Sequence, residues 1–281
     1  MKKGLLFIVV VLTAFAGAAQ DVTQCHTSAP DKFAMFASNK EFNKAHLNPR
    51  VYTHVSDEGG TMVKFKTPDG KEANGYAIRN PKATNNWILV FQEWWGLNDN
   101  VKRESERLYK DLGNVNVLAL DMFDGKVATD RETAGKYMGE FKQDRGNAII
   151  KGALEYVGRN AKIGTIGWCF GGGESMQAAL LAGTQTAACV MYYGMPEENM
   201  DRLKALSGDV LFIFAAKDKW INQDVVTKFE NNMKTAGKKL TVKKYDADHG
   251  FANPSNATIY DKTATEDAYK HALELFKAKL K

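Results

Sequence analysis

Short apolar runs alternate with amphipathic segments along most of the chain. Apolar runs of four to eight residues predict buried strands, and segments with an apolar stripe at helical spacing predict helices. Two antiparallel strands are predicted around Pro68-Asp69-Gly70, where proline sets φ and glycine supplies a positive φ for the turn. The predicted strands span residues 61–67, 74–79, 87–91, 115–120, 163–166, 188–193, 210–215 and 240–245, and the predicted helical regions 98–112, 129–158, 174–182, 222–236 and 260–280. This alternation predicts an α/β fold, with a mostly parallel central sheet and helices on both faces.

The first residues have a different pattern from this alternation. Lys2 and Lys3 precede an apolar stretch over residues 5–15, and small residues follow at 16–19. This order is typical of a secretory signal peptide, residues 1–19, and the apolar stretch is short for a membrane span. An uncleaved anchor is the alternative. Cleavage would leave an exported protein, periplasmic or secreted, with no stable membrane span.

Residues 20–58 are polar and irregular, and we interpret them as an N-terminal extension of a domain at 59–281. A helix is predicted over residues 31–45, with Phe33, Phe36 and Phe42 on one side. His46 and His54 are predicted to be surface residues. The pattern assigns no function to this extension.

Composition favours one globular domain without nucleic-acid binding. The chain has 281 residues, of which 44% are hydrophobic, and a net charge of +5 that falls to +3 without Lys2 and Lys3. The basic residues are spread in lysine pairs and are not interleaved with aromatic residues, as they would be in a nucleic-acid-binding run.

A glycine-rich stretch at residues 162–173 carries the first candidate for chemistry. The predicted strand leads into Gly167-Trp168-Cys169-Phe170-Gly171, and a helical run follows. Strand, sharp turn and helix form the context of a nucleophile elbow, here with cysteine at the apex. Cys169 would lie at the positive end of a helix, which favours the thiolate. The alternative is an inert, buried cysteine.

Three further candidates follow other predicted strands: Glu93, Asp218 and His249. In parallel sheets the working residues lie beyond the carboxyl ends of the strands. Nucleophile, acid and histidine occur in the order expected of hydrolases with an elbow. Each has a simpler interpretation, as a structural carboxylate or a loop histidine. Asp224 is a less well-placed alternative acid, and His271 is interpreted as part of a solvated helix face.

These residues have distinct expected roles. His249 would pair with the Cys169 thiolate, and Asp218 would accept the other ring N–H of His249. The backbone N–H groups of Phe170 and Trp94 are the expected oxyanion donors. No metal or organic cofactor is required.

The other two cysteines are not assigned to catalysis. Cys189 lies in an apolar run and is predicted to be core. Cys25 and His26 are expected to belong to an ordinary terminal segment, and a weak metal-ligand pair is the alternative. A catalytic Cys169 must stay reduced, so any disulfide would join Cys25 to Cys189.

Together, Gln92-Glu93 with Gly96, the elbow, Asp218 and His249-Gly250-Phe251 resemble the dienelactone hydrolase family, also called carboxymethylenebutenolidases. The resemblance covers roughly residues 60–280. It implies an α/β-hydrolase fold, and a Cys-Asp-His triad that hydrolyses an enol-lactone or related small ester through an acyl-enzyme. It also implies that Glu93 takes part in activating the nucleophile.

Two arginines that bind the substrate carboxylate in the family are not clearly matched. Asn253 lies near one position, and Arg131 is a possible counterpart of the other. We therefore expect a substrate other than dienelactone itself. The residues expected to line an apolar pocket are Trp168, Phe251, Trp95, Phe123, Trp94 and Trp220.

Two other classes of protein compete with this interpretation. A non-catalytic small-molecule-binding protein could keep the fold and pocket. A thiol redox protein could use Cys169, but the sequence has no nearby resolving cysteine.

Overall fold

The computed structural model describes residues 28–50 and 52–281. The predicted signal peptide, Cys25 and His26 lie outside these residues. Eight strands form one sheet in the order β1-β2-β4-β3-β5-β6-β7-β8. Their bounds are β1 Thr61–Lys66, β2 Glu72–Ile78, β3 Asn86–Phe91, β4 Asn116–Leu120, β5 Lys162–Trp168, β6 Thr186–Tyr192, β7 Asp209–Ala215 and β8 Leu240–Tyr245.

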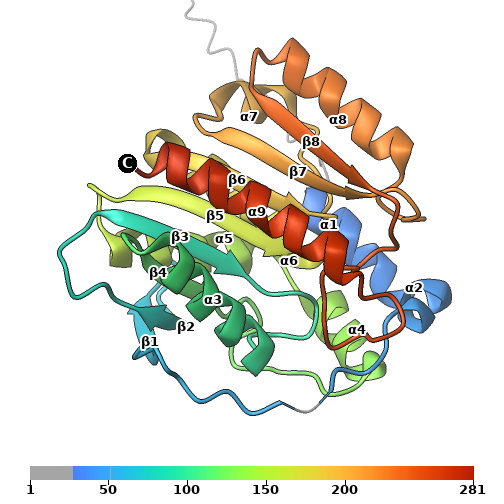
Figure 1. The fold of residues 1–281 in the computed structure, drawn as a ribbon, viewed down its shortest axis with the longest axis horizontal. Coiled ribbons are helices and arrows are strands. Elements are labelled where there is room, and N and C mark those ends of the chain that lie inside the picture. Colours follow the sequence, from blue (N-terminus) through green and yellow to red (C-terminus); the bar gives the residue numbers. More distant parts are fainter. Residues whose placement is uncertain (1–27, 51) are drawn as a thin grey trace, which may run out of the picture.

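The pairing confirms a mostly parallel sheet. Strands β4, β3, β5, β6, β7 and β8 run parallel, whereas β1 and β2 are antiparallel additions at one edge. The central strands β3 and β4 are buried at every position because helices cover both faces. The carboxyl ends of the parallel strands therefore meet along one edge of the sheet (Figure 1).

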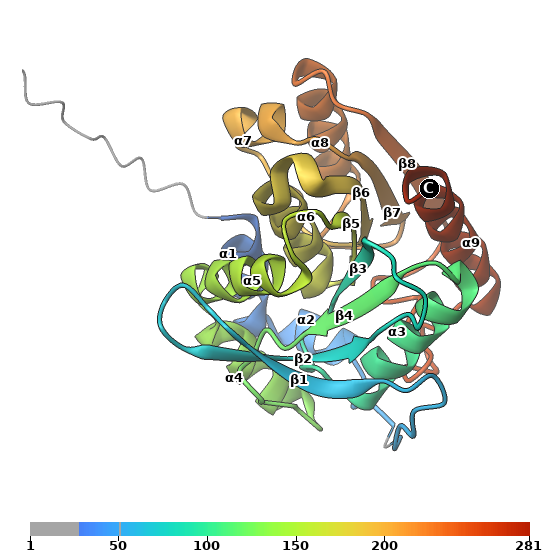
Figure 2. The same ribbon diagram turned by 90° about the vertical axis from the view of Figure 1, so that its left-hand side faces the viewer.

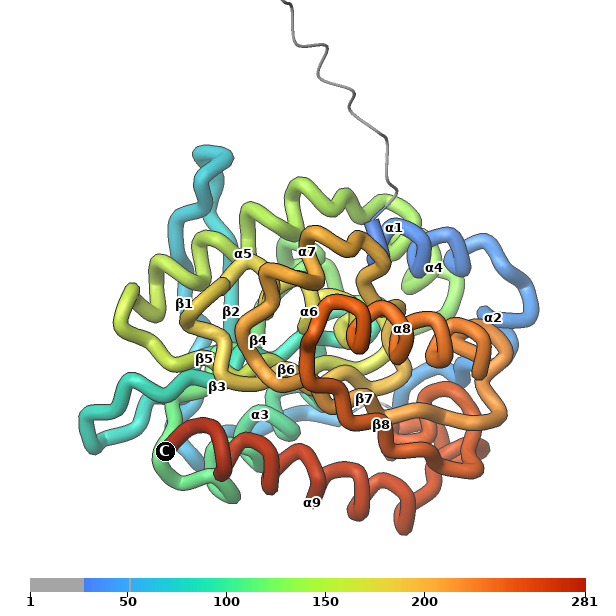
Figure 3. Tube along the Cα trace, turned by 90° about the horizontal axis from the view of Figure 1, so that it is seen from above, coloured from blue at the N-terminus to red at the C-terminus, as the bar shows by residue number. Residues whose placement is uncertain are grey.

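Helices cover the sheet in two layers (Figures 1 and 3). On one face lie α3 (Asp99–Leu112) and α9 (Lys262–Lys279), and the opposite layer includes α5 (Gln143–Val157), α6 (Phe170–Ala182) and α8 (Gln223–Thr235). Asn98 caps α3 by accepting a hydrogen bond from the Val101 N–H, and Gly113 ends the helix with φ 73°. These are the helix signals that the sequence carries at both ends. Among the described residues, no helix is long and apolar enough to cross a membrane.

Two helical predictions were too long. The region at 129–158 is divided into α4 (Arg131–Glu140) and α5, with Phe141 and Lys142 extended between them. The predicted helix at 31–45 is divided into α1 (Ala29–Ala34), a 3₁₀ turn η1 (Met35–Ser38) and α2 (Lys40–Ala45). Asn39 breaks the second region because its side chain caps α2 and its backbone is extended. A short helix, α7 (Met200–Ala205), was not predicted.

The N-terminal extension lies across the carboxyl ends of the strands (Figures 1 and 2). Helix α1 packs against α6, and η1 packs against α4. Phe33 and Phe42 of the extension are fully buried. The extension is therefore part of the core at the end of the sheet where parallel α/β folds carry their functional residues.

Candidate active site

Cys169 lies at the apex of a sharp turn between β5 and α6. Its backbone has φ 59° and ψ −120°, a left-handed conformation that a residue with a Cβ adopts only under strain. The turn is held by the Cys169 N–H, which donates to the Tyr192 carbonyl at 3.0 Å, and by the Gly172 N–H, which donates to the Cys169 carbonyl at 3.0 Å. This is the backbone form of the predicted elbow.

The glycines on either side of Cys169 are required by close backbone approach. A Cβ at Gly167 would collide with the backbone of Gly171, and a Cβ at Gly171 would collide with the carbonyl groups of Phe91 and Gln92. Because these obstacles are backbone atoms, a small side-chain adjustment would not remove them. The strand-to-helix turn can therefore close only with glycine at both positions.

His249 and Asp218 form a buried pair behind the cysteine. His249 lies on the loop after β8, Asp218 lies on the loop after β7, and Nδ1 of His249 is 2.5 Å from Oδ2 of Asp218. Asp218 is held in turn by the N–H groups of Trp220 and Ile221, which donate to its Oδ1 at 2.8 and 2.9 Å. The carboxylate therefore fixes the ring so that Nε2 is the nitrogen left free. Asp224, the alternative acid, is an exposed residue in the first turn of α8.

Burial and charge have opposite effects on the pKa values of His249 and Asp218. Burial alone would lower the pKa of His249, but the Asp218 carboxylate and the Cys169 sulfur raise that pKa well above its usual value. Burial would raise the pKa of Asp218, but the charge and hydrogen bond of His249 hold it below its usual value. Asp218 is therefore placed to stabilise the positive charge that His249 acquires when it accepts a proton.

The Cys169 sulfur differs from the sequence-based expectation of a stabilised thiolate. Burial raises the pKa of Cys169, and the nearby His249 offsets this effect only in part. Its exposed fraction is 1% because the extension covers it. In this closed arrangement the loss of hydration outweighs the helix N-terminus, so the structure favours the thiol.

Glu93 lies on the loop after β3 and is held by Asn253. The side-chain N–H of Asn253 donates to Oε2 of Glu93 at 2.5 Å. Burial raises the pKa of Glu93 to about 7, although the positive His249 and the Asn253 hydrogen bond lower it. A carboxyl group with this pKa exists in both protonation states near neutrality, which suits a proton-transfer group.

The two expected oxyanion donors lie on the predicted loops. Phe170 is the first residue of α6, where its backbone N–H has no carbonyl partner within the helix. Trp94 lies in the turn after β3, and no described backbone carbonyl accepts its N–H. Both N–H groups are therefore free of secondary-structure bonds that would compete with a ligand oxygen.

The extension adds residues to this site that the sequence analysis did not assign to it. His46 was predicted to lie on the surface, but it is buried, and its ring centroid is 5.4 Å from that of His249. Phe33 and Phe42 also pack on His249, with centroids at 6.1 and 5.7 Å. His54, also predicted to lie on the surface, has a buried side chain beside Glu106. The apolar stripe at 31–45 was the available signal, because two of its phenylalanines needed a surface to cover.

Two cavities approach the site from different sides. One, of about 50 Å³, is lined by Glu93, Trp168 and Asn253, together with residues of α3 and α9. The other, of about 330 Å³, is lined by His249 and Trp220, together with residues of α2. Trp168 and Trp220 therefore line two different cavities.

The remaining predicted pocket residues have other positions. Phe123 packs against Phe170, Phe251 packs against Tyr193, and Trp95 packs against Trp94, all of them buried. Arg131 begins α4, where its backbone N–H donates to Asn48. Cys189 is fully buried, as predicted. Its possible disulfide with Cys25 involves a residue outside the described part of the chain.

Comparison with solved structures supports an α/β-hydrolase fold. A dienelactone hydrolase-like promiscuous phosphotriesterase from metagenomic libraries superposes with a TM-score of 0.67 at 23% identity, over 79% of this chain and 99% of that chain. An esterase from Pyrococcus furiosus gives a TM-score of 0.60 at 15% identity, over 84% of this chain and 100% of that chain. At these identities the likeness establishes the fold alone.

Sequence comparison is more specific. The model of the dienelactone hydrolase family matches residues 73–280. A protein of Aquifex aeolicus (strain VF5), provisionally named a carboxymethylenebutenolidase, is 30% identical over 238 residues, covering 79% of this chain and all of that protein. The protein usf of Aquifex pyrophilus is 30% identical over 234 residues, covering 78% of this chain and 98% of that protein.

The fold and these matches define an α/β-hydrolase. The chain belongs to the dienelactone hydrolase family. Membership implies the hydrolysis of ester or lactone bonds.

Proposed function

We propose that this protein is an exported hydrolase of small, uncharged esters or lactones that uses Cys169 as its nucleophile. The observation that carries the proposal is the strained cysteine at the elbow, with the buried His249–Asp218 pair beside it. Strain of this kind is retained in proteins where it serves a function. A merely structural buried cysteine would need neither the left-handed backbone nor the paired histidine.

In the proposed reaction, Nε2 of His249 accepts the thiol proton of Cys169 as sulfur attacks the ester carbonyl carbon. The N–H groups of Phe170 and Trp94 stabilise the oxyanion. Collapse of the intermediate breaks the C–O bond, the leaving oxygen takes the proton from His249, and an acyl-enzyme remains. Water, deprotonated by His249, then hydrolyses the thioester and restores the thiol.

Glu93 would regulate the ionisation of Cys169. A negative Glu93 raises the pKa of the thiol, so a protonated Glu93 makes ionisation easier. With a pKa of about 7, Glu93 can change its charge at little cost when a substrate enters the adjoining cavity. The thiol would then be activated on binding and protected from oxidation between turnovers.

The preference for an uncharged substrate rests on the surroundings of Glu93. Asn253, near the position of a family arginine, is engaged by Glu93. The arginines that line the same cavity are already paired with acids: Arg107 with Glu266 at 2.6 Å, and Arg103 with Glu104 at 3.5 Å. A substrate carboxylate would have to displace these partners.

Steady-state hydrolysis of p-nitrophenyl acetate and of a dienelactone, side by side, tests the proposal. We expect turnover of the plain ester with a burst of p-nitrophenol, and its loss in Cys169→Ala. Cys189→Ala, which removes a buried thiol away from His249, is the matched control. Ester hydrolysis that persists in Cys169→Ala would refute the nucleophile, and preference for the dienelactone would refute the uncharged substrate.

Export is tested separately. The residues at 1–19 support removal of a signal peptide. N-terminal sequencing of the protein from its native host should show a mature chain that begins near residue 20, and an intact Met1 in the cytoplasmic fraction would refute export.

A further inference from the structure

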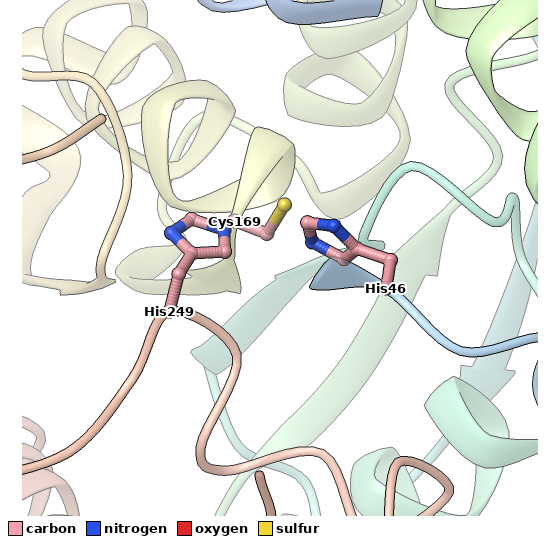
Figure 4. A group of neighbouring side chains, drawn as sticks. All are labelled: His46, Cys169 and His249. Carbon is pink, nitrogen blue, oxygen red and sulfur yellow. The ribbon is translucent and has the colours of Figure 1, made fainter. Parts of the chain in front are cut away.

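Three side chains that can ligate a metal ion converge at the covered site. The sulfur of Cys169 and one ring nitrogen each of His46 and His249 lie within 4.8 Å of one another, and all three residues are buried (Figure 4). His46 comes from the extension, whereas the other two come from the catalytic loops. The cluster therefore exists only when the extension is docked.

Both histidines are oriented like metal ligands. Nδ1 of His249 is bound by the Asp218 carboxylate, and Nδ1 of His46 is 2.7 Å from the Phe42 carbonyl. Ligating histidines almost always use the second nitrogen in this way, to a carboxylate or a backbone carbonyl. In both rings Nε2 is buried without a hydrogen-bond partner among the described residues.

The free nitrogen of His46 requires an explanation. The surroundings of this residue are aromatic: Phe42 lies at 4.3 Å and Trp94 at 4.7 Å between ring centroids. A phenylalanine or leucine would suit these neighbours, whereas a buried nitrogen without a partner costs about 1–3 kcal/mol. Catalysis by the triad makes no use of His46, so its lone pair is available for another ligand.

We infer that Cys169, His249 and His46 form a binding site for a thiophilic transition-metal ion of the Zn²⁺ class. One thiolate and two imidazoles are a donor set that suits such ions and is poor for Mg²⁺ or Ca²⁺. Three protein ligands leave a fourth position for water.

The geometry needs only a small contraction. Tetrahedral Zn²⁺ with bonds of about 2.0–2.3 Å separates its ligand atoms by roughly 3.3–3.8 Å. Ligands up to 4.8 Å apart must therefore approach by about 1 Å. The Cys169–His249 pair holds one exchangeable proton, which is released as the ion takes the sulfur and the nitrogen lone pair. His46, with Nδ1–H donating to Phe42, releases none.

Binding of the ion would block hydrolysis, a consequence that rests on the proposed function. The ion would occupy both the nucleophilic sulfur and Nε2 of His249. It would also hold the extension closed, because His46 would be bonded to the catalytic loop. The bound form would be an inactive store of the reduced thiol.

Titration of the full chain with Co²⁺, a spectroscopic substitute for Zn²⁺, tests the site without any assay of activity. The protein carries Cys25→Ser and His26→Gln, so that terminal ligands do not contribute. We expect one equivalent to give a sulfur-to-cobalt charge-transfer band, displaced by Zn²⁺ but not by Mg²⁺. The band should disappear in Cys169→Ser. In His46→Gln the affinity for Co²⁺ should fall by at least about 100-fold. His271→Gln, which removes a partly exposed imidazole, should leave it unchanged.

A second measurement guards against loss of the fold. At the same concentration, Zn²⁺ should raise the Tm of this protein more than the Tm of His46→Gln, with near-ultraviolet circular dichroism showing that the variant is folded. Absence of the band, or a band of equal affinity in folded His46→Gln, would overturn the inference. Zinc binding without ester hydrolysis would contradict the proposed function alone, and hydrolysis without the band would contradict the metal site alone.

Discussion

The side-chain amide of Asn253 donates a hydrogen bond to Glu93 at 2.5 Å, which joins the loop after β8 to the loop after β3. This contact connects the loop that carries His249 with a carboxyl group whose negative charge raises the pKa of Cys169. It also engages a side chain near the position where the resemblance to the family led us to expect a substrate-binding arginine. Asn253 is therefore a positioning residue for Glu93.

Replacement of Asn253 should change the pH dependence of hydrolysis. Asn253 donates to the ionised form of Glu93, so Asn253→Leu should raise the pKa of Glu93 above 7. We expect the limb of the kcat/KM profile that reports this group to shift to higher pH by up to about one unit. Asn253→Asp is the contrasting variant, since a second carboxylate raises the pKa further. An unshifted profile in both would contradict the assignment.

Glu93 should also make stability depend on pH. The pKa of Glu93 is raised to about 7 from 4.5, so the stabilisation contributed by its protonated form is complete below about pH 4.5 and is lost as the pH rises through 7. Glu93→Gln keeps the shape of the protonated side chain. At pH 8 its free energy of unfolding, measured by chemical denaturation, should therefore exceed that of the parent by on the order of 1–2 kcal/mol.

The two proteins should match at pH 4. Exposed Glu41 provides the control, because Glu41→Gln should have little effect at either pH. Equal stability of Glu93→Gln and the parent at pH 8 would show that ionisation of Glu93 does not lower the free energy of unfolding.

The elbow should not tolerate a single methyl group at Gly171. The new Cβ would collide with the backbone of β3, so Gly171→Ala should displace the strand or the helix and cost several kcal/mol. Chemical denaturation measures the loss. Gly139→Ala is the control: its Cβ would lie 3.6 Å from Ala37, an ordinary contact, and alanine in a helix is favoured by about 1 kcal/mol. Equal stability of the two variants would show that the backbone approach is looser than described.

Loss of one aromatic ring from the extension should expose the Cys169 sulfur. Phe42 is fully buried and packs on His46, Trp94 and His249. Phe42→Ala should weaken the docking of the extension by about 3 kcal/mol. This corresponds to roughly a 100-fold increase in the fraction of molecules in which the extension is detached from Cys169. Iodoacetamide labelling of Cys169, followed by mass spectrometry of the peptide, should accelerate accordingly.

Phe36→Ala is the matched control for this experiment, because Phe36 is only partly buried and packs on Phe33 and Phe42. Labelling of Phe42→Ala at the parental rate would mean that the extension does not limit access to the sulfur.

The sheet could be predicted because its strands are apolar runs separated by turn residues. The order of Cys169, Asp218 and His249 along the chain indicated which loops would meet, since these loops follow strands that end at one edge of a parallel sheet. Helix breaks at Asn39 and Phe141 were missed because helical periodicity continues across them. A capping side chain or a tertiary contact decides such breaks.

The position of His46 could not be predicted for a different reason. A histidine after a short helix carries no local signal of burial, and its neighbours Trp94 and His249 lie 48 and 203 residues further along the chain. The raised pKa of Cys169 could not be predicted either, because its cause also lies in a distant part of the chain. The helix N-terminus is visible in the sequence, but the cover that removes water from the sulfur is contributed by the extension.

The family match begins at residue 73, after the segment that carries Phe33, Phe42 and His46. The family match therefore includes Cys169, Asp218 and His249, whereas the residues of the extension that cover them lie outside it. Replacement of the N-terminal extension by another segment could change the cover over Cys169 without any substitution in the residues that the family model matches. Access to Cys169 would then be set before residue 73 as well as by the residues that line the pocket.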